Sequence, residues 1–122
     1  MRDLLHRIEA RQARVVVVGA GYVGLPLAVE TATAGFDTIA FDTNPDKVRA
    51  IAQGTSTIRD ISSATLAPLV RSGKLTASTD PDVLRAADVV VVCVPTPLNK
   101  TKDPDNSFII EAVDLIAARM RP

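Results

Sequence analysis

Three glycines that follow an apolar run form the most informative spacing in this chain of 122 residues. Four consecutive valines, Val15–Val18, lead directly into Gly19, Gly21 and Gly24, which read Gly-x-Gly-x-x-Gly. Asp42 stands 18 residues after Gly24, at the end of the second predicted strand. A glycine loop between a buried strand and a helix, with an acidic residue about 20 positions further on, is the fingerprint of a dinucleotide site.

Each position of the loop has a physical role in such a site. Gly19 allows the tight turn, Gly21 lets the backbone approach a pyrophosphate, and Gly24 lets the helix pack close to the strand. The amides of Tyr22 and Val23, at the positive end of the helix dipole, would receive the diphosphate, and the ring of Tyr22 would cover it. The alternative is a glycine turn that binds nothing.

Asp42 and Lys47 would serve the adenosine end of the cofactor. A carboxylate at the position of Asp42 accepts hydrogen bonds from ribose hydroxyls and repels a 2′-phosphate, which predicts NAD rather than NADP. Asp42 also suits a turn or N-cap before Asn44 and Pro45, and the two roles are compatible. Lys47, in the first turn of the next predicted helix, either contacts the ribose or faces solvent, and its spacing alone favours solvent.

A third segment follows the fourth predicted strand. That strand, over 89–94, ends at Pro95 because a proline supplies no donor to the ladder. In a sheet whose order reverses between the first and fourth strands, ligands bind beyond the carboxyl ends of those strands. Val94, Pro95 and Thr96 are therefore expected beside the nicotinamide side of the cofactor. The alternative is a purely structural loop.

The chain has one Cys and one His, which excludes an internal disulfide and a metal site built from several cysteines. Cys93 lies in a valine-rich strand with no neighbouring His or Lys in the sequence to lower its pKa. A small core residue is therefore favoured over a nucleophile. His6 stands alone near the amino terminus. We predict no catalytic residue and no metal ligand in this chain.

The elements that position these residues alternate between strand and helix. The apolar pattern and the Gly, Pro and Asn signals predict strands over 15–18, 36–41, 75–79 and 89–94, and helices over 22–34, 45–53, 66–71, 81–87 and 107–119. This alternation indicates an α/β fold, a Rossmann-like doubly wound parallel sheet of strand order 3-2-1-4 that lacks later strands. The fourth strand, expected to be fully buried, would stand at an open edge, which indicates a missing fifth strand. The last helix is expected to bury Ile109, Val113, Ile116 and Ala117.

Charge and length exclude several classes of protein. The 14 basic and 14 acidic residues balance, so neither nucleic acid nor a membrane is an expected partner. No apolar run suffices to cross a bilayer, and no signal-peptide core is present, which predicts a cytoplasmic protein.

Two parts of the chain are distinguished. Residues 1–13 are predicted to form a leader helix with Leu4, Leu5 and Ile8 on one face, and packing on its own domain is favoured over binding a partner. Residues 14–122 would form one nucleotide-binding domain, whose end is either natural or a truncation and whose length is too short for catalysis by itself.

Two segments resemble the UDP-glucose/GDP-mannose dehydrogenase family. The first reads Gly-Tyr-Val-Gly-Leu-Pro-Leu-Ala over 21–28, and the second-strand pattern of the family is matched at Asp42, Asn44, Lys47 and Val48. The second and more specific segment reads Cys-Val-Pro-Thr-Pro-Leu-Asn-Lys over 93–100, followed by Pro104-Asp105 and Ser107-Phe108-Ile109. It is similar to the branch that oxidises UDP-N-acetylglucosamine or UDP-N-acetylmannosamine to the uronic acid.

The resemblance implies an enzyme with an NAD-binding domain, a central helical segment and a UDP-binding domain. Such an enzyme would oxidise C6 of the sugar in two steps with two NAD, through a cysteine that lies beyond this chain. The cofactor-binding positions that carry over are Gly19, Gly21, Tyr22, Val23, Gly24, Asp42, Lys47, Val94, Pro95 and Thr96. NAD would be the partner of this chain, while the UDP-sugar would bind only to the full-length enzyme, implied to be a homo-oligomer. Contacts of the loop over 58–61 do not carry over, because it reads Ile-Arg-Asp-Ile where the family often has Glu.

Two alternatives remain at this point. One is part of another NAD-dependent dehydrogenase, of the hydroxyacyl-CoA or 6-phosphogluconate type, against which the segment over 94–100 argues. The other is a stand-alone nucleotide-binding or regulatory module, which a native stop codon after Pro122 and a stable monomer would favour.

Overall fold

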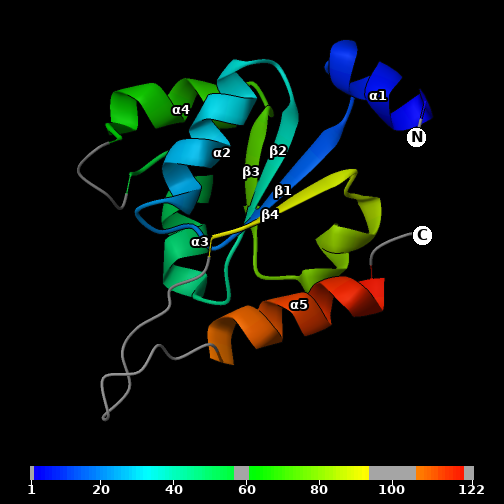
Figure 1. Ribbon diagram of the computed structural model, residues 1–122. Helices are drawn as coiled ribbons and strands as arrows, with labels where there is room; N and C mark the ends of the chain where they lie inside the picture. Colours follow the sequence, from blue (N-terminus) through cyan, green and yellow to red (C-terminus); the bar gives the residue numbers. More distant parts are fainter. Residues whose placement is uncertain (1, 57–60, 94–106, 120–122) are drawn as a thin grey trace.

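The computed structural model describes residues 2–56, 61–93 and 107–119, in which helices and strands alternate (Figure 1). In chain order the elements are α1 (Arg2–Glu9), β1 (Arg14–Val18), α2 (Gly24–Thr33), β2 (Asp37–Phe41), α3 (Pro45–Ala52), α4 (Ser63–Arg71), β3 (Leu75–Ser78), the 3-10 helix η1 (Pro81–Ala86), β4 (Val89–Val92) and α5 (Ser107–Arg119). The four strands are parallel and form one sheet in the order β3-β2-β1-β4. The predicted α/β fold with strand order 3-2-1-4 is confirmed.

β1 lies inside the sheet and pairs with a strand on each side. Val15 pairs with Thr38 of β2 and with Val89 of β4. Because helices cover both faces of the sheet, the valines at 15–18 are all almost fully buried, as a continuous apolar run in a parallel sheet predicts. The carboxyl end of β1 therefore delivers the glycine loop from a rigid central position.

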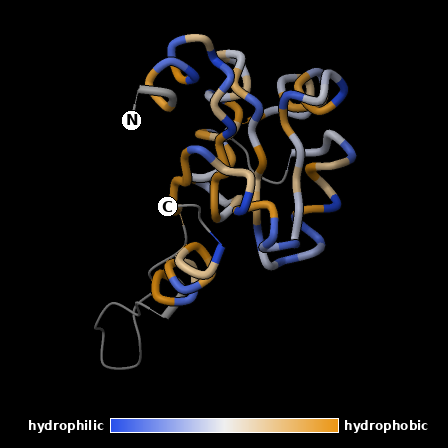
Figure 2. Tube along the Cα trace, turned by 90° about the vertical axis from the view of Figure 1, so that its right-hand side faces the viewer, coloured by the Kyte–Doolittle hydropathy of each residue, from blue (hydrophilic) through white to orange (hydrophobic). Residues whose placement is uncertain are grey.

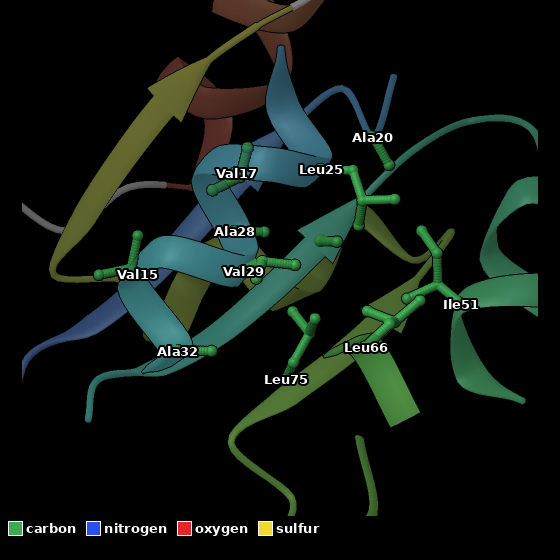
Figure 3. Packing of buried hydrophobic residues seen from close by; sticks show 11 residues of the cluster. Val15, Val17, Ala20, Leu25, Ala28, Val29, Ala32, Ile51, Leu66 and Leu75 are labelled. Carbon is green, nitrogen blue, oxygen red and sulfur yellow. The ribbon is translucent and has the colours of Figure 1, made fainter. Parts of the chain in front are cut away.

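Two hydrophobic cores pack on opposite faces of the sheet. The first joins the sheet to α2, α3 and α4 and includes Val15, Val17, Leu25, Ala28, Val29, Ala32, Ile51, Leu66 and Leu75 (Figure 3). The second joins the other face to η1 and α5 and contains Val16, Val18, Phe41, Leu84, Ala87 and Ala112. The first core holds α2 along its length, so the start of this helix has a defined position beside β1.

β4 is less buried than its sequence predicts. It ends at Val92, which is 38% exposed, and its other valines are half-buried. The expectation of a fully buried strand is wrong, because in the described part of the chain β4 pairs with β1 alone and leaves its other edge open. The open edge itself is as predicted, whereas Val94, expected as the last strand residue, lies outside the described residues.

The last helix has the predicted bounds but buries a different face. Ala112 is buried and Ile109 and Ile116 are half-buried, whereas Val113 is 50% exposed and Ala117 is exposed. The predicted stripe is therefore wrong at two of its four positions. Hydrophobic residues occupy more than one face of this helix, since Ile110 and Val113 are exposed while Ala112 is buried (Figure 2). Packing on η1 selects the face that contains Ala112, a choice that helical periodicity alone does not make.

Capping side chains set the ends of two other elements. α4 begins three residues before its predicted start because the Ser62 hydroxyl accepts the N–H of Thr65 at 3.2 Å. Asp80 caps the N–H of Asp82 at 2.9 Å but starts a 3-10 helix rather than an α-helix. Oxygen-bearing side chains at these positions satisfy amides that the first helical turn leaves without partners.

The leader helix α1 is attached to the domain through charged groups. Arg7 donates to the carboxylate of Asp88 at 2.8 Å, and this carboxylate, only 6% exposed, also accepts the N–H of Arg14 at 2.8 Å. The side chain of Arg11 donates to the carbonyl oxygen of Ala34 at the end of α2. By contrast, Leu5 of the predicted apolar face is 53% exposed. The arginines, not the apolar face, hold α1 beside the sheet.

The described helices are all too short or too polar to cross a membrane.

Replacing Arg7 with Met should lower the free energy of unfolding by about 1.5–3 kcal/mol, because the nearly buried carboxylate of Asp88 loses a charged donor. Chemical denaturation of both proteins measures the difference. Arg49→Met is a matched control, because Arg49 forms an ion pair with Asp46 at 3.3 Å in which both side chains are exposed. The free energy of unfolding of this variant should change by less than about 0.5 kcal/mol. Equal losses in the two variants would contradict the attachment described for α1.

Candidate dinucleotide-binding site

The loop from β1 to α2 is shaped by two of its glycines. Gly19 has a φ of 101°, in the left-handed region that favours glycine, and its N–H donates to the carbonyl oxygen of Phe41 at 2.8 Å. A Cβ atom on Gly24 would lie 1.6 Å from the carbonyl oxygen of Gly19. No residue with a side chain fits at Gly24 without movement of the backbone, so α2 begins directly against the turn.

At Gly21, unlike at Gly24, there is room for a Cβ atom. Apart from the two neighbouring residues in the chain, a Cβ atom on Gly21 would have a single heavy atom of the described residues within 4 Å, the Nζ of Lys47 at 4.0 Å. The described part of the chain therefore leaves the space beside this backbone open. A bare peptide with an ammonium group beside it suits a phosphate.

The start of α2, next to Gly21 in the chain, has amides without a partner among the described residues. Val23 is the N-cap residue and makes no side-chain cap hydrogen bond. Among the described residues no backbone acceptor pairs with the amides of Tyr22 and Val23, while the N–H of Leu25 already bonds to Gly21 at 3.0 Å. Free amides at the positive end of a helix bind anions. The side chain of Tyr22 is 77% exposed, and its covering role stays a prediction.

Asp42 lies at the carboxyl end of β2 and is held by backbone amides. Its Oδ2 accepts the N–H of Ala20 at 2.9 Å, and its Oδ1 accepts the N–H of Asn44 at 2.9 Å. The turn role considered for Asp42 is thus present, although the N-cap of the next helix is Asn44. Each carboxylate oxygen has a second lone pair, so the same group can still accept from a ribose hydroxyl. That contact stays a prediction.

Lys47 lies closer to the loop than its spacing indicated. It is half-buried in the first turn of α3, with its Nζ beside Gly21. It makes no ion pair with any residue in the described ranges. Whether this ammonium contacts a ribose or only solvent is not tested by the geometry, and its contact with the cofactor stays a prediction.

Cys93 is the last described residue before the segment expected at the nicotinamide. Its N–H donates to Val18 at 2.7 Å, and its Cβ lies 3.3 Å from where a Cβ on Gly24 would be. Burial raises the pKa of the Cys93 thiol, so the thiol stays protonated at neutral pH, which agrees with a packing role. It is half-buried rather than buried, because β4 is an edge strand.

The remaining expected contacts are not described. Val94, Pro95 and Thr96 lie outside the described residues, and their place beside the nicotinamide stays a prediction. Within the described ranges no three His, Cys, Asp or Glu side chains come together as a metal site would require. Asn44 was predicted only as the start of a helix, whereas it also bonds to Asp42 and to the amides of Asp46 and Lys47.

Taken together, the parallel sheet, the glycine loop at the end of its central strand and the acidic residue after the next strand define a dinucleotide-binding domain. The chain belongs to the UDP-glucose/GDP-mannose dehydrogenase family, whose NAD binding domain matches residues 13–122. This membership decides against the hydroxyacyl-CoA and 6-phosphogluconate alternatives.

Similar proteins agree in sequence and in structure. The UDP-N-acetyl-D-mannosamine dehydrogenase of Pyrococcus horikoshii is 32% identical over 108 residues, which cover 88% of this chain and 26% of that protein. The UDP-N-acetyl-D-glucosamine 6-dehydrogenase of Pseudomonas aeruginosa is 32% identical over 106 residues, or 87% and 24% of the two chains. The crystal structure of a ternary complex of GDP-mannose dehydrogenase from Pseudomonas aeruginosa superposes with a TM-score of 0.81 and 31% identity, covering 84% and 24%. The chain spans about a quarter of the length of these relatives.

NAD is the cofactor of this domain, and the geometry of the loop fits it. The bare peptide at Gly21 is a cradle that a Cβ atom would fill, and Lys47 adds a positive charge beside it. Asp42 is held at the end of β2, the ribose position of this fold.

Alanine at the second and third glycines of the loop should separate binding from stability. Gly21→Ala adds a methyl group in open space, so we expect the free energy of unfolding to change by less than about 1 kcal/mol while NAD affinity falls at least about tenfold. Gly24→Ala forces the backbone apart and should cost about 3 kcal/mol or more. Chemical denaturation and calorimetric titration with NAD measure both quantities. Full NAD affinity in Gly21→Ala, or wild-type stability in Gly24→Ala, would contradict the geometry described.

Proposed function

We propose that this domain forms the NAD site of a nucleotide-sugar 6-dehydrogenase, which oxidises the C6 hydroxyl of a UDP-N-acetylhexosamine to the uronic acid. The observation that carries the proposal is the open peptide at Gly21, bordered by Lys47 and by the start of α2. The substrate class is supported by the names of the two relatives above, which act on UDP-N-acetylmannosamine and UDP-N-acetylglucosamine. The segment over 93–100 is the part of the sequence that most specifically resembles this branch.

The electron count of the proposed reaction requires two cofactor molecules. Conversion of a primary alcohol to a carboxylate removes four electrons, and NAD, when bound, supplies a hydride acceptor that takes two of them. The proposed stoichiometry is therefore two NAD for each sugar. Both rounds would use the same loop, because it binds the diphosphate and not the reacting ring.

Different residues of this chain would bind different parts of the cofactor. The amides of Tyr22 and Val23, which have no backbone acceptor among the described residues, would hold the diphosphate at the positive end of α2. The ammonium of Lys47, beside Gly21, would contact the cofactor next to them. Asp42 would accept from the adenosine ribose, with its orientation set by the Ala20 and Asn44 amides. Val94, Pro95 and Thr96 are proposed to border the nicotinamide.

The carboxylate of Asp42 should determine the choice between NAD and NADP. We expect the domain to bind NAD more tightly than NADP, because a 2′-phosphate would meet this negative charge. Asp42→Asn removes the charge and keeps an oxygen acceptor for one of the two backbone amides that Asp42 binds. It should reduce the preference for NAD at least about tenfold. Calorimetric titrations of both proteins with both cofactors give the four affinities. Tighter binding of NADP by the wild type, or an unchanged ratio in the variant, would refute the role of Asp42.

These 122 residues are proposed to bind NAD weakly and to catalyse nothing alone, since the family resemblance places the nucleophilic cysteine beyond them. We expect no formation of NADH above background when the chain is incubated with NAD and UDP-N-acetylglucosamine or UDP-N-acetylmannosamine. The absorbance of NADH is the readout, and an active nucleotide-sugar dehydrogenase is the positive control. Turnover by the chain would show that it contains a catalytic group that we have not assigned.

A further inference from the structure

Asn44 lies between the two charged groups of the site and contacts both of their segments. Its backbone N–H donates to Oδ1 of Asp42 at 2.9 Å. Its side-chain oxygen accepts the N–H of Asp46 at 2.9 Å and, at a longer 3.4 Å, the N–H of Lys47. One residue therefore bonds to the carboxylate at the end of β2 and to the first turn of α3.

The first turn of α3 is the part of the helix that most needs such a contact. α3 has eight residues, with Pro45 first and Lys47 third. The amides of a first turn have no partners within the helix, and a short helix has little other support. The backbone that carries Lys47 is thus held by the Asn44 side chain. A loosened first turn would let the ammonium move away from Gly21.

We propose that Asn44 is a positioning residue for NAD binding, whose side chain holds the first turn of α3, and with it Lys47, while its backbone N–H bonds to Asp42. The inference rests on the proposed roles of Asp42 and Lys47 in binding NAD. Asn44 acts through these two residues and needs no contact of its own with NAD. Because Asp42 is also tied to Ala20 of the glycine loop at 2.9 Å, the carboxylate, the loop and α3 form one connected unit.

The chain contains a matched helix cap that lacks this connection. Ser62 caps α4 by accepting the N–H of Thr65 at 3.2 Å. In the described ranges, however, the one atom within 4 Å of the Cβ position of Gly21, apart from its two neighbours in the chain, belongs to Lys47 of α3 and not to α4. Loss of the Ser62 cap should weaken a helix without altering the cofactor site. A general loss of stability and a specific loss of positioning can therefore be told apart.

The test is an NMR titration of the 122-residue chain with NAD, which measures weak binding and reports the amides of the loop directly. Asn44→Ala should weaken binding about three- to tenfold, the factor that corresponds to loss of one helix cap. Asn44→Ser, which retains an oxygen at the cap, should restore affinity to within about twofold of wild type. Ser62→Ala should lose comparable stability on denaturation and keep wild-type affinity for NAD.

A double variant tests whether Asn44 acts through Lys47. Lys47→Met alone should weaken binding, and Asn44→Ala/Lys47→Met should be weakened by much less than the product of the two single effects. If the wild type shows no NAD-dependent shifts, the proposed site fails and the inference fails with it. If the wild type binds but Asn44→Ala binds equally well, or Ser62→Ala loses as much affinity, only the positioning role is overturned. If the loss of NAD affinity in the double variant equals the product of the two single losses, action of Asn44 through Lys47 is likewise refuted.

Discussion

The close approach of Gly24 to the carbonyl oxygen of Gly19 is the contact on which the rest of the site depends. A helix can begin so near the end of β1 only because no side chain separates the two backbones. The first core then holds α2 along its length, through Leu25, Ala28 and others. The positive end of the helix and the bare peptide at Gly21 therefore face the same space. A larger residue at Gly24 would move the helix end and its free amides away from that space.

Local groups, not net charge, form the proposed anion site of this domain. The chain has no net charge at neutral pH, yet the uncapped start of α2 and the ammonium of Lys47 both lie beside Gly21. Net charge averages over the whole surface, whereas a diphosphate responds to groups within a few ångströms. The carboxylate of Asp42 does not oppose this arrangement, because it is held at the end of β2 by two backbone amides.

Features that depend on residues adjacent in the chain could be predicted from the sequence, and features that depend on contacts between separate elements could not. The glycine loop, the cap at Asn44 and the alternation of strands and helices were all readable, because each depends on residues adjacent in the chain. β4 and α5 were assigned to the right residues but with the wrong burial. An apolar run indicates that its residues are buried, but how far each one is buried depends on the strand or helix that covers it, which lies elsewhere in the chain.

By itself, the sequence determined the family, the parallel α/β fold and the glycine turn after β1, because backbone conformation and strand periodicity follow from residue type and spacing. Only the tertiary structure decided that the Nζ of Lys47 lies beside Gly21, and that Asn44 joins its helix to Asp42. It also decided that α1 attaches through Arg7 and Asp88. These contacts join residues on separate elements, and their distances follow from how the helices pack on the sheet, which spacing along the chain does not specify.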